Sequence, residues 1–291
     1  MFVQTNTIAA CLEYIKKKLE SQFNASEIRH IQRAIFKKIF DLNVADLMLH
    51  KENRLTESEL LHVRELVLRL HANEPIQYVM GQTEFCDLTI DCNPNALIPR
   101  PETEELVFKV LEHSALNQNQ PRILDLGTGT GCIALALKYK LKHADVWALD
   151  FSIAALQLAQ SNAEKLNLPI KFVSGDIHQL ELIEPLHSSP WDLIISNPPY
   201  IPFQEKSIMA SNVLDHEPHM ALFVSDEDPL VFYKSIAQFA IKNLKEGGLL
   251  AFELHENLAD KTANFCTILG FSSVEIFEDL QGKPRILLAQ V

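Results

Sequence analysis

Three stretches of the first seventy residues carry apolar side chains at intervals of three and four positions. These stretches are Ile8 to Leu19, Ile28 to Ile39 and Leu60 to Leu70. The spacing places the apolar residues on one face of a helix, so each stretch predicts an amphipathic helix. Ser26 is expected to cap the second helix, and Thr56 with Glu59 has capping-box spacing at the start of the third. We therefore expect a small helical bundle over residues 1–74.

Short β-prone segments replace this pattern between Pro75 and Pro101. Residues 82–85 and 87–90 are flanked by glycine, asparagine and proline, which end helices and favour turns. This arrangement predicts a β-hairpin linker over residues 75–104.

Strand-like apolar runs alternate with helical stretches from Pro121 onward. The expected strands are residues 122–126, 145–149, 170–173, 192–196, 249–253, 274–277 and 285–289. Helices between the first five are typical of a parallel, doubly wound sheet, whereas only a turn around Gly282 separates the last two, so one of these should run antiparallel. A helix is also expected from the acidic residues 226–228 to near Gly247. We therefore expect a Rossmann-like α/β domain over residues 105–291.

The charge balance differs between the two parts of the chain. The net charge is -12, yet residues 1–74 carry 11 Lys and Arg against 10 Asp and Glu, so the acidity belongs to the α/β part. Nucleic-acid affinity comes largely from neutralising phosphates, so this balance opposes a direct nucleic-acid partner.

Composition narrows the class of protein further. The hydrophobic fraction is 47%, and no apolar run reaches the roughly 18 residues that a membrane-spanning helix needs. The first lysines follow the apolar residues and the first arginine is Arg29, which fits neither a secretory signal nor a transit peptide. The five cysteines are widely spaced, without a C-x-x-C pair. We expect a cytoplasmic monomer without a membrane segment or a metal.

A glycine-rich loop follows the first expected strand of the α/β domain. Its residues are Gly127, Thr128, Gly129, Thr130 and Gly131. Glycines allow a positive φ and the close approach of a ligand to the backbone. Asp150 ends the second strand, where its carboxylate is expected to accept from the two ribose hydroxyls of a nucleoside. Asp176 follows the third strand, at the expected adenine site. A turn without a ligand is the alternative for the loop, and a simple turn residue is the alternative for Asp176.

The fourth strand of this domain leads directly into Asn197-Pro198-Pro199-Tyr200. The two prolines have no amide donor, so the backbone here offers carbonyl acceptors only. The Asn197 side-chain oxygen and the Pro198 carbonyl are expected to accept from one NH2 group, while Tyr200 packs on the flat face of the substrate. Two fixed acceptors would turn a nitrogen lone pair toward a methyl donor and stabilise the positive charge that grows on nitrogen. The motif therefore indicates methyl transfer to a planar nitrogen, with Asn197, Pro198 and Tyr200 as catalytic residues and Pro199 in the substrate site.

The chain resembles the PrmC (HemK) family of release factor glutamine methyltransferases. The resemblance rests on the loop and the Asn-Pro-Pro-Tyr motif together with Pro75 to Tyr78, Leu97 to Glu104, and Glu217-Pro218 followed by Ala221-Leu222. It implies a seven-stranded class I methyltransferase domain and an N-terminal helical domain that recognises class I peptide-chain release factors. It further implies S-adenosylmethionine as donor, and N5-methylation of the glutamine in a Gly-Gly-Gln motif. In this family the loop, Asp150, Asp176, Ile177 and Asn197 would bind the donor.

The chain departs from the family pattern in two places. Val224 and Ser225 stand where relatives often have Gly-Gly, and His255 replaces a small residue. His216-Glu217-Pro218-His219 invites a metal interpretation, but Pro218 breaks the helical geometry that would aim both imidazoles at one ion.

Three alternatives remain open. An adenine-N6 nucleic-acid methyltransferase would also present a planar NH2 group to this motif after base flipping. A non-catalytic binding protein could keep the nucleoside pocket. An NAD dehydrogenase would share a glycine loop, but its spacing is G-x-G-x-x-G rather than the G-x-G-x-G found here.

Overall fold

The computed structural model describes residue 3 and residues 5–291. Their contacts group into two units. The first comprises the chain up to Gln82 with residues 210–216, and the second comprises residues 83–209 and 217–291. The domain limits expected at residues 74 and 104 stay a prediction. In the described part of the chain, no helix has both the length and the apolar character needed to cross a membrane.

The first unit is a helical bundle, as expected. Its helices are α1 (Ile8–Leu19), α2 (Ala25–Phe40), α3 (Val44–Leu49), α4 (Glu57–His71), α5 (Ile76–Met80) and α9 (Ser211–His216). Thr56 and Glu59 form the expected capping box at the start of α4. The expected cap on α2 is wrong, because Asn24 and not Ser26 accepts from the first amides and forms a capping box with Glu27. The apolar faces pack together into one core, in which Ile15, Ile35 and Leu70 are fully buried.

A β-hairpin opens the second unit. Its strands are β1 (Gln82–Phe85) and β2 (Leu88–Asp91). The Asn162 side chain binds the end of β2, because its Oδ1 accepts from the Asp91 backbone amide at 2.8 Å and its Nδ2 donates to the Asp91 carbonyl at 3.1 Å. The same Nδ2 donates to the Thr130 carbonyl at 3.0 Å, so the hairpin is tied to the glycine loop.

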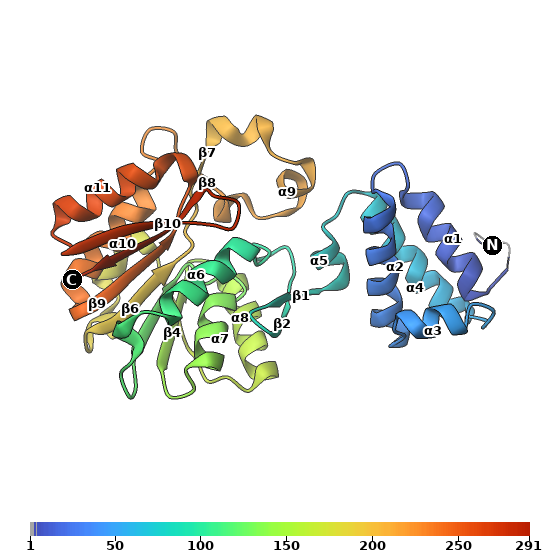
Figure 1. The fold of residues 1–291 in the computed structure, drawn as a ribbon, viewed down its shortest axis with the longest axis horizontal. Coiled ribbons are helices and arrows are strands. Elements are labelled where there is room, and N and C mark those ends of the chain that lie inside the picture. The colour runs from blue at the N-terminus through green and yellow to red at the C-terminus, as the bar shows by residue number, and fades with distance from the viewer. Residues whose placement is uncertain (1–2, 4) are drawn as a thin grey trace. The chain divides into compact units, whose positions relative to one another are not determined.

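Seven strands form one sheet in the second unit (Figure 1). In spatial order they are β10 (Ser273–Glu278), β11 (Pro284–Gln290), β9 (Leu244–Glu253), β6 (Trp191–Ser196), β3 (Arg122–Leu126), β4 (Asp145–Asp150) and β5 (Lys171–Ser174). β11 runs antiparallel to both of its neighbours, and the other pairings are parallel. The predicted Rossmann-like fold with one antiparallel strand is confirmed.

Helices cover both faces of this sheet (Figure 1). One face packs against α6 (Pro101–Leu111), α7 (Cys132–Lys140) and α8 (Ile153–Leu166), and the other against α10 (Val231–Asn243) and α11 (Ala259–Leu269). Successive side chains of a strand alternate between the faces, so Leu193 and Ile195 join one core while Ile194 joins the other. Each of these side chains is fully buried. Burying one such side chain stabilises the folded state by roughly 1.5 to 3 kcal/mol.

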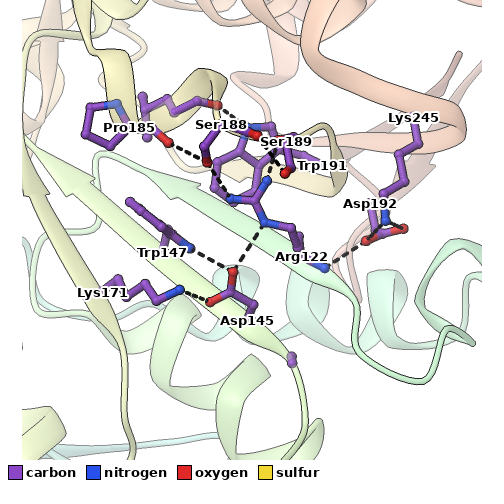
Figure 2. Close-up of polar contacts among 12 residues, drawn as sticks. Arg122, Asp145, Trp147, Lys171, Pro185, Ser188, Ser189, Trp191, Asp192 and Lys245 are labelled. Carbon is purple, nitrogen blue, oxygen red and sulfur yellow. Dashed lines mark hydrogen bonds and ion pairs between the residues drawn. The ribbon is translucent and has the colours of Figure 1, made fainter.

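The amino ends of the parallel strands are joined by ion pairs (Figure 2). Asp145 at the start of β4 accepts from Arg122 Nε at 3.2 Å and from Lys171 Nζ at 2.7 Å. Asp192 of β6 accepts from Lys245 Nζ at 2.6 Å and from the Arg122 amide at 2.8 Å. Charged side chains therefore hold the first residues of β3, β4, β5, β6 and β9 together.

Two short parallel strands pair within the connection that follows β6. β7 (Ile201–Pro202) pairs with β8 (Phe223–Val224), and Val224 is buried. The Ser225 hydroxyl accepts from the Glu227 amide at 3.2 Å. The residues that depart from the family pattern here thus complete a buried strand and the turn after it.

The helix expected to end near Gly247 ends earlier, at Asn243. Leu244 has an extended backbone and already pairs with Trp191 of β6, so the last strand of the parallel set begins there. Tertiary pairing with a buried strand overrides the helical pattern at these positions.

Candidate active site

The glycine loop lies at the carboxyl end of β3 and leads into α7. Gly127, Gly129 and Gly131 have φ values of +75°, +56° and +83°, in the left-handed region that favours glycine. Gly127 and Gly129 line a cavity of about 400 Å³. A Cβ atom on either would make only ordinary contacts, at 3.6 Å from Ile177 Cδ1 and 3.9 Å from Ala96 Cβ, so the positive φ rather than crowding favours glycine at these two cavity positions.

Gly131 has a different environment from the other two glycines. It is not among the residues that line the cavity, and a Cβ atom there would lie 3.1 Å from Ala159 Cβ and 3.3 Å from Leu135 Cδ1. Its conformation starts α7 and allows that helix to pack closely against α8. Its predicted contact with a donor stays a prediction.

The first three amide donors of the loop are already used within the protein. Gly127 and Thr128 donate to the Leu149 carbonyl at 2.8 and 3.0 Å, and the Gly129 amide donates to Asp150 Oδ2 at 2.8 Å. A loop that binds a pyrophosphate instead points its amides at the ligand. This geometry opposes the dinucleotide alternative.

Two carboxylates line the same cavity. Asp150 ends β4 and also accepts from the Ser152 amide at 2.8 Å, and burial raises the pKa of its carboxyl. Asp176 caps the 3₁₀ helix Ile177–Leu182 by accepting from the His178 amide at 2.8 Å. Each carboxylate oxygen can accept more than one hydrogen bond, so both residues keep acceptor capacity toward a ligand.

The predicted donor and acceptor residues largely share this cavity. The predicted site residues among its lining are Gly127, Thr128, Gly129, Thr130, Asp150, Asp176, Ile177, Asn197 and Pro199. Pro198 is buried and is not part of that lining. Tyr200 also lies outside it, with its ring against His255 at a centroid distance of 5.9 Å. The structure thus brings Asn197 to the loop and both acids, whereas the predicted packing of Tyr200 on a substrate stays a prediction.

Asn197 is fixed by a buried set of hydrogen bonds. Asn197 Nδ2 donates to Thr103 Oγ1 at 3.1 Å, and Thr103 Oγ1 donates to Glu253 Oε2 at 2.6 Å. The Tyr200 hydroxyl donates to Glu253 Oε1 at 3.0 Å. Within the described part of the chain Asn197 Oδ1 has no hydrogen-bond partner, and Asn197 borders the cavity.

Burial governs the ionisation of the groups behind Asn197. It raises the pKa of Glu253, while hydrogen bonds from Thr103 and Tyr200 and the nearby Arg285 act in the opposite direction. It also raises the pKa of Tyr200 well above its usual range, so that hydroxyl keeps its proton and remains a donor. Thr103 and Glu253 were missed as site residues by sequence reasoning, although Thr103 lies in the stretch that carries the family resemblance.

Arg100 lines the same cavity and forms an ion pair with Glu217. Arg100 Nη2 lies 2.5 Å from Glu217 Oε1, and Glu217 Oε2 accepts from the Ile98 amide at 3.2 Å. The Glu217 side chain is 1% exposed. This pair joins the segment before α6 to the segment after α9 and gives the buried Glu217 carboxylate a partner.

His255, the second departure from the family pattern, is buried beside this region. Its Nε2 lies 3.0 Å from Glu205 Oε2, and its Nδ1 accepts from the Asn257 amide at 3.2 Å. Because Nδ1 accepts, the ring proton lies on Nε2 and is donated to Glu205. His255 therefore caps the turn after β9 and binds the connection that follows the Asn-Pro-Pro-Tyr motif.

Comparisons with known proteins agree with this geometry. Residues 10–81 match the PrmC N-terminal domain, and residues 104–218 match the methyltransferase small domain. A release factor glutamine methyltransferase from Bacteroides thetaiotaomicron is 37% identical over 95% of this chain and 97% of its own length.

Solved structures support the fold. The hMettl16 catalytic domain in complex with an RNA hairpin from MAT2A has a TM-score of 0.58 at 19% identity, covering 93% of this chain and 92% of that one. The 16S rRNA methyltransferase RsmC of Thermus thermophilus, solved with AdoMet and guanosine, has a TM-score of 0.53 at 17% identity, covering 72% of this chain and 49% of that one. Both are class I methyltransferase folds. With its long match to the Bacteroides enzyme, the chain belongs to the release factor glutamine methyltransferase family.

Proposed function

We propose that this enzyme methylates the side-chain N5 nitrogen of the glutamine in the Gly-Gly-Gln motif of class I peptide-chain release factors, with S-adenosylmethionine as donor. Membership of the family supports the reaction and the substrate class. In this proposal residues 1–74 recognise the release factor, residues 75–104 form the linker and residues 105–291 carry out the chemistry.

The cavity lining fits the chemistry of the donor. S-adenosylmethionine supplies a methyl group on a positively charged sulfur and also carries an ammonium group, so an acidic lining favours it. Asp150 would accept from the ribose hydroxyls, Asp176 and Ile177 would hold the adenine, and Gly127 and Gly129 leave room for the ligand against the backbone.

Asn197 and Pro198 would hold the acceptor nitrogen. Their oxygens accept from the two N–H groups of the glutamine amide, which turns the nitrogen lone pair toward the donor methyl. As the nitrogen–carbon bond forms, these acceptors stabilise positive charge on nitrogen and then direct its departing proton toward solvent. No general base has to remove that proton before the attack.

One observation carries the proposal. The NH2 group of Asn197 is bound by Thr103, so its carbonyl oxygen remains the available group at the cavity. An oxygen acceptor in that position suits a substrate NH2 group, whether from an amide or from an amine on a ring, and the family membership selects the glutamine amide.

Mass spectrometry of a release factor tests this proposal directly. A purified factor incubated with the enzyme and donor should gain the mass of one methyl group on the motif glutamine. A factor with that glutamine replaced by alanine is the matched control and should gain nothing. Methyl transfer to a DNA or RNA oligonucleotide, with the factor unmodified, would establish the adenine alternative instead.

A further inference from the structure

Two hydrogen bonds link Asn197 to Glu253 through the Thr103 hydroxyl, and in each of them the donor can be assigned. Thr103 Oγ1 donates to Glu253 Oε2 at 2.6 Å, and this bond uses the single proton of the hydroxyl. Toward Asn197 the same hydroxyl can then only accept. The group that faces it at 3.1 Å must be the Asn197 NH2, and this leaves Oδ1 free.

The reverse orientation of the Asn197 amide is disfavoured by the same set. It would place Oδ1 against the lone pairs of Thr103 with no proton between them. Thr103 is 2% exposed and Glu253 is 1% exposed, so water cannot readily replace the lost hydrogen bond. The hydrogen bonds of Thr103 therefore select one of the two orientations of the Asn197 amide, which differ only by exchange of its oxygen and its NH2 group.

The Glu253 carboxylate is held from both sides. The Tyr200 hydroxyl donates to Oε1, while Thr103 donates to Oε2. The backbone carbonyl of Glu253 accepts from the Tyr233 hydroxyl at 3.0 Å, which fixes the end of β9 independently of the carboxylate. Replacing the Glu253 carboxyl by an amide can thus reverse the hydrogen bond to Thr103, while the backbone bond from Tyr233 still holds the end of β9.

We propose that Thr103 and Glu253 are positioning residues for methyl transfer. Acting through Asn197, they keep its oxygen turned toward the substrate NH2 group, and in this respect the inference rests on the proposed function. Neither residue needs to touch the donor or the substrate. Their loss should lower turnover and leave donor affinity unchanged.

Substitutions at Thr103 test whether its hydroxyl acts in this way. Thr103→Val keeps the shape and should lower kcat about 10- to 100-fold, with the Kd for the donor changed less than about twofold. Thr103→Ser returns the hydroxyl and should recover most of the lost turnover. Thr262→Val is the matched control, because Thr262 is equally buried in α11 and donates to the Leu258 carbonyl at 2.9 Å. It should lower stability and leave kcat within about twofold.

Glu253→Gln tests whether the Thr103 hydroxyl must donate to residue 253 for Asn197 to keep its orientation. Glutamine keeps the size and can still bond to Thr103, but its NH2 group can donate to that hydroxyl and release the Asn197 amide to either orientation. We expect kcat to fall about tenfold with donor affinity unchanged. Wild-type kcat in Thr103→Val or in Glu253→Gln would overturn the proposal.

A measurement that needs no release factor separates this inference from the proposed function. In the enzyme with ¹⁵N-labelled asparagine, the Asn197 NH2 signal should show slowed hydrogen exchange, and Thr103→Val should abolish that protection. An unprotected Asn197 NH2 in the wild type would refute the positioning role whatever the substrate. A protected NH2 in an enzyme that does not methylate release factors would keep the positioning role and reject the proposed function.

Discussion

Buried and half-buried carboxylates have different hydrogen-bond partners at the two ends of the parallel strands. At the amino ends, Asp145 and Asp192 each bond to a lysine (Figure 2). At the carboxyl ends, Asp125, Asp150 and Glu253 receive hydrogen bonds from hydroxyl and amide groups. In the described part of the chain no lysine or arginine donates to these three.

The pKa values follow this difference. Burial alone would raise the pKa of Asp145, but hydrogen bonds from Lys171, Trp147 and Arg122 outweigh it and lower the pKa. Burial raises the pKa of Asp125 to about 7 and also raises the pKa of Asp150. One end of the sheet therefore stabilises the fold, whereas the other keeps acidic groups at a cost in stability, where a cationic donor would bind.

The largest expected effect on turnover follows from removing the Asn197 side-chain oxygen at the carboxyl ends of the strands. Asn197→Ala should lower kcat about 100- to 1,000-fold, because it deletes an oxygen that stabilises charge in the transition state. Donor affinity, measured by calorimetry, should change less than about threefold. Turnover equal to that of the wild type would remove Asn197 from the mechanism.

The same substitution at the two ends of β4 gives a matched pair. Asp150→Asn should weaken donor binding about 10- to 100-fold, since it removes a charged acceptor from the cavity. Asp145→Asn should leave the Kd for the donor within about twofold and lower the free energy of unfolding by about 1 to 2 kcal/mol. Equal effects of the two variants on donor affinity would contradict the division of roles between the ends.

The ionisation of Asp125 predicts a pH dependence of stability. With a folded pKa of about 7 and an unfolded value near 4, the folded state binds more protons between these pH values. The stability that protonated Asp125 contributes is present at low pH and lost as the pH rises through about 7. Asp125→Asn should therefore gain about 1 to 3 kcal/mol relative to the wild type between pH 5 and pH 8. Denaturant unfolding of both proteins across this range measures the difference, and parallel profiles would contradict the assignment.

The smallest expected effect is on the free energy of unfolding, from loss of Lys171 at the amino ends of the strands. Lys171 is 57% exposed, and Arg122 and Trp147 continue to donate to Asp145 without it. Lys171→Met should change the free energy of unfolding by about 0.5 kcal/mol or less. A loss above about 2 kcal/mol, determined by urea unfolding, would show that this exposed pair matters more than its environment suggests.

Long, continuous apolar patterns made the sheet predictable from sequence. Residues 122–126 and 192–196 form β3 and most of β6, because a central parallel strand is buried on both faces. The end of α10 and the Ser26 cap were wrong, since pairing of Leu244 and an earlier asparagine cap decided those boundaries. Short α3 escaped prediction because six residues display too little periodicity.

The candidate site was predictable where its residues adjoin strand ends. Asn197 and Asp150 each follow or end a strand, and parallel strands bring their carboxyl ends to one edge of the sheet. Thr103 and Glu253 are 150 positions apart, and their hydrogen bond depends on how α6 packs against β9. No local pattern encodes such a contact. It emerges only with the tertiary structure.

A crystal structure with S-adenosylhomocysteine and a Gly-Gly-Gln peptide tests the central claim most directly. The account predicts the glutamine nitrogen about 3 Å from both Asn197 Oδ1 and the Pro198 carbonyl oxygen, facing the sulfur of the product. A glutamine side chain held elsewhere, or an Asn197 NH2 group turned toward it, would contradict the account.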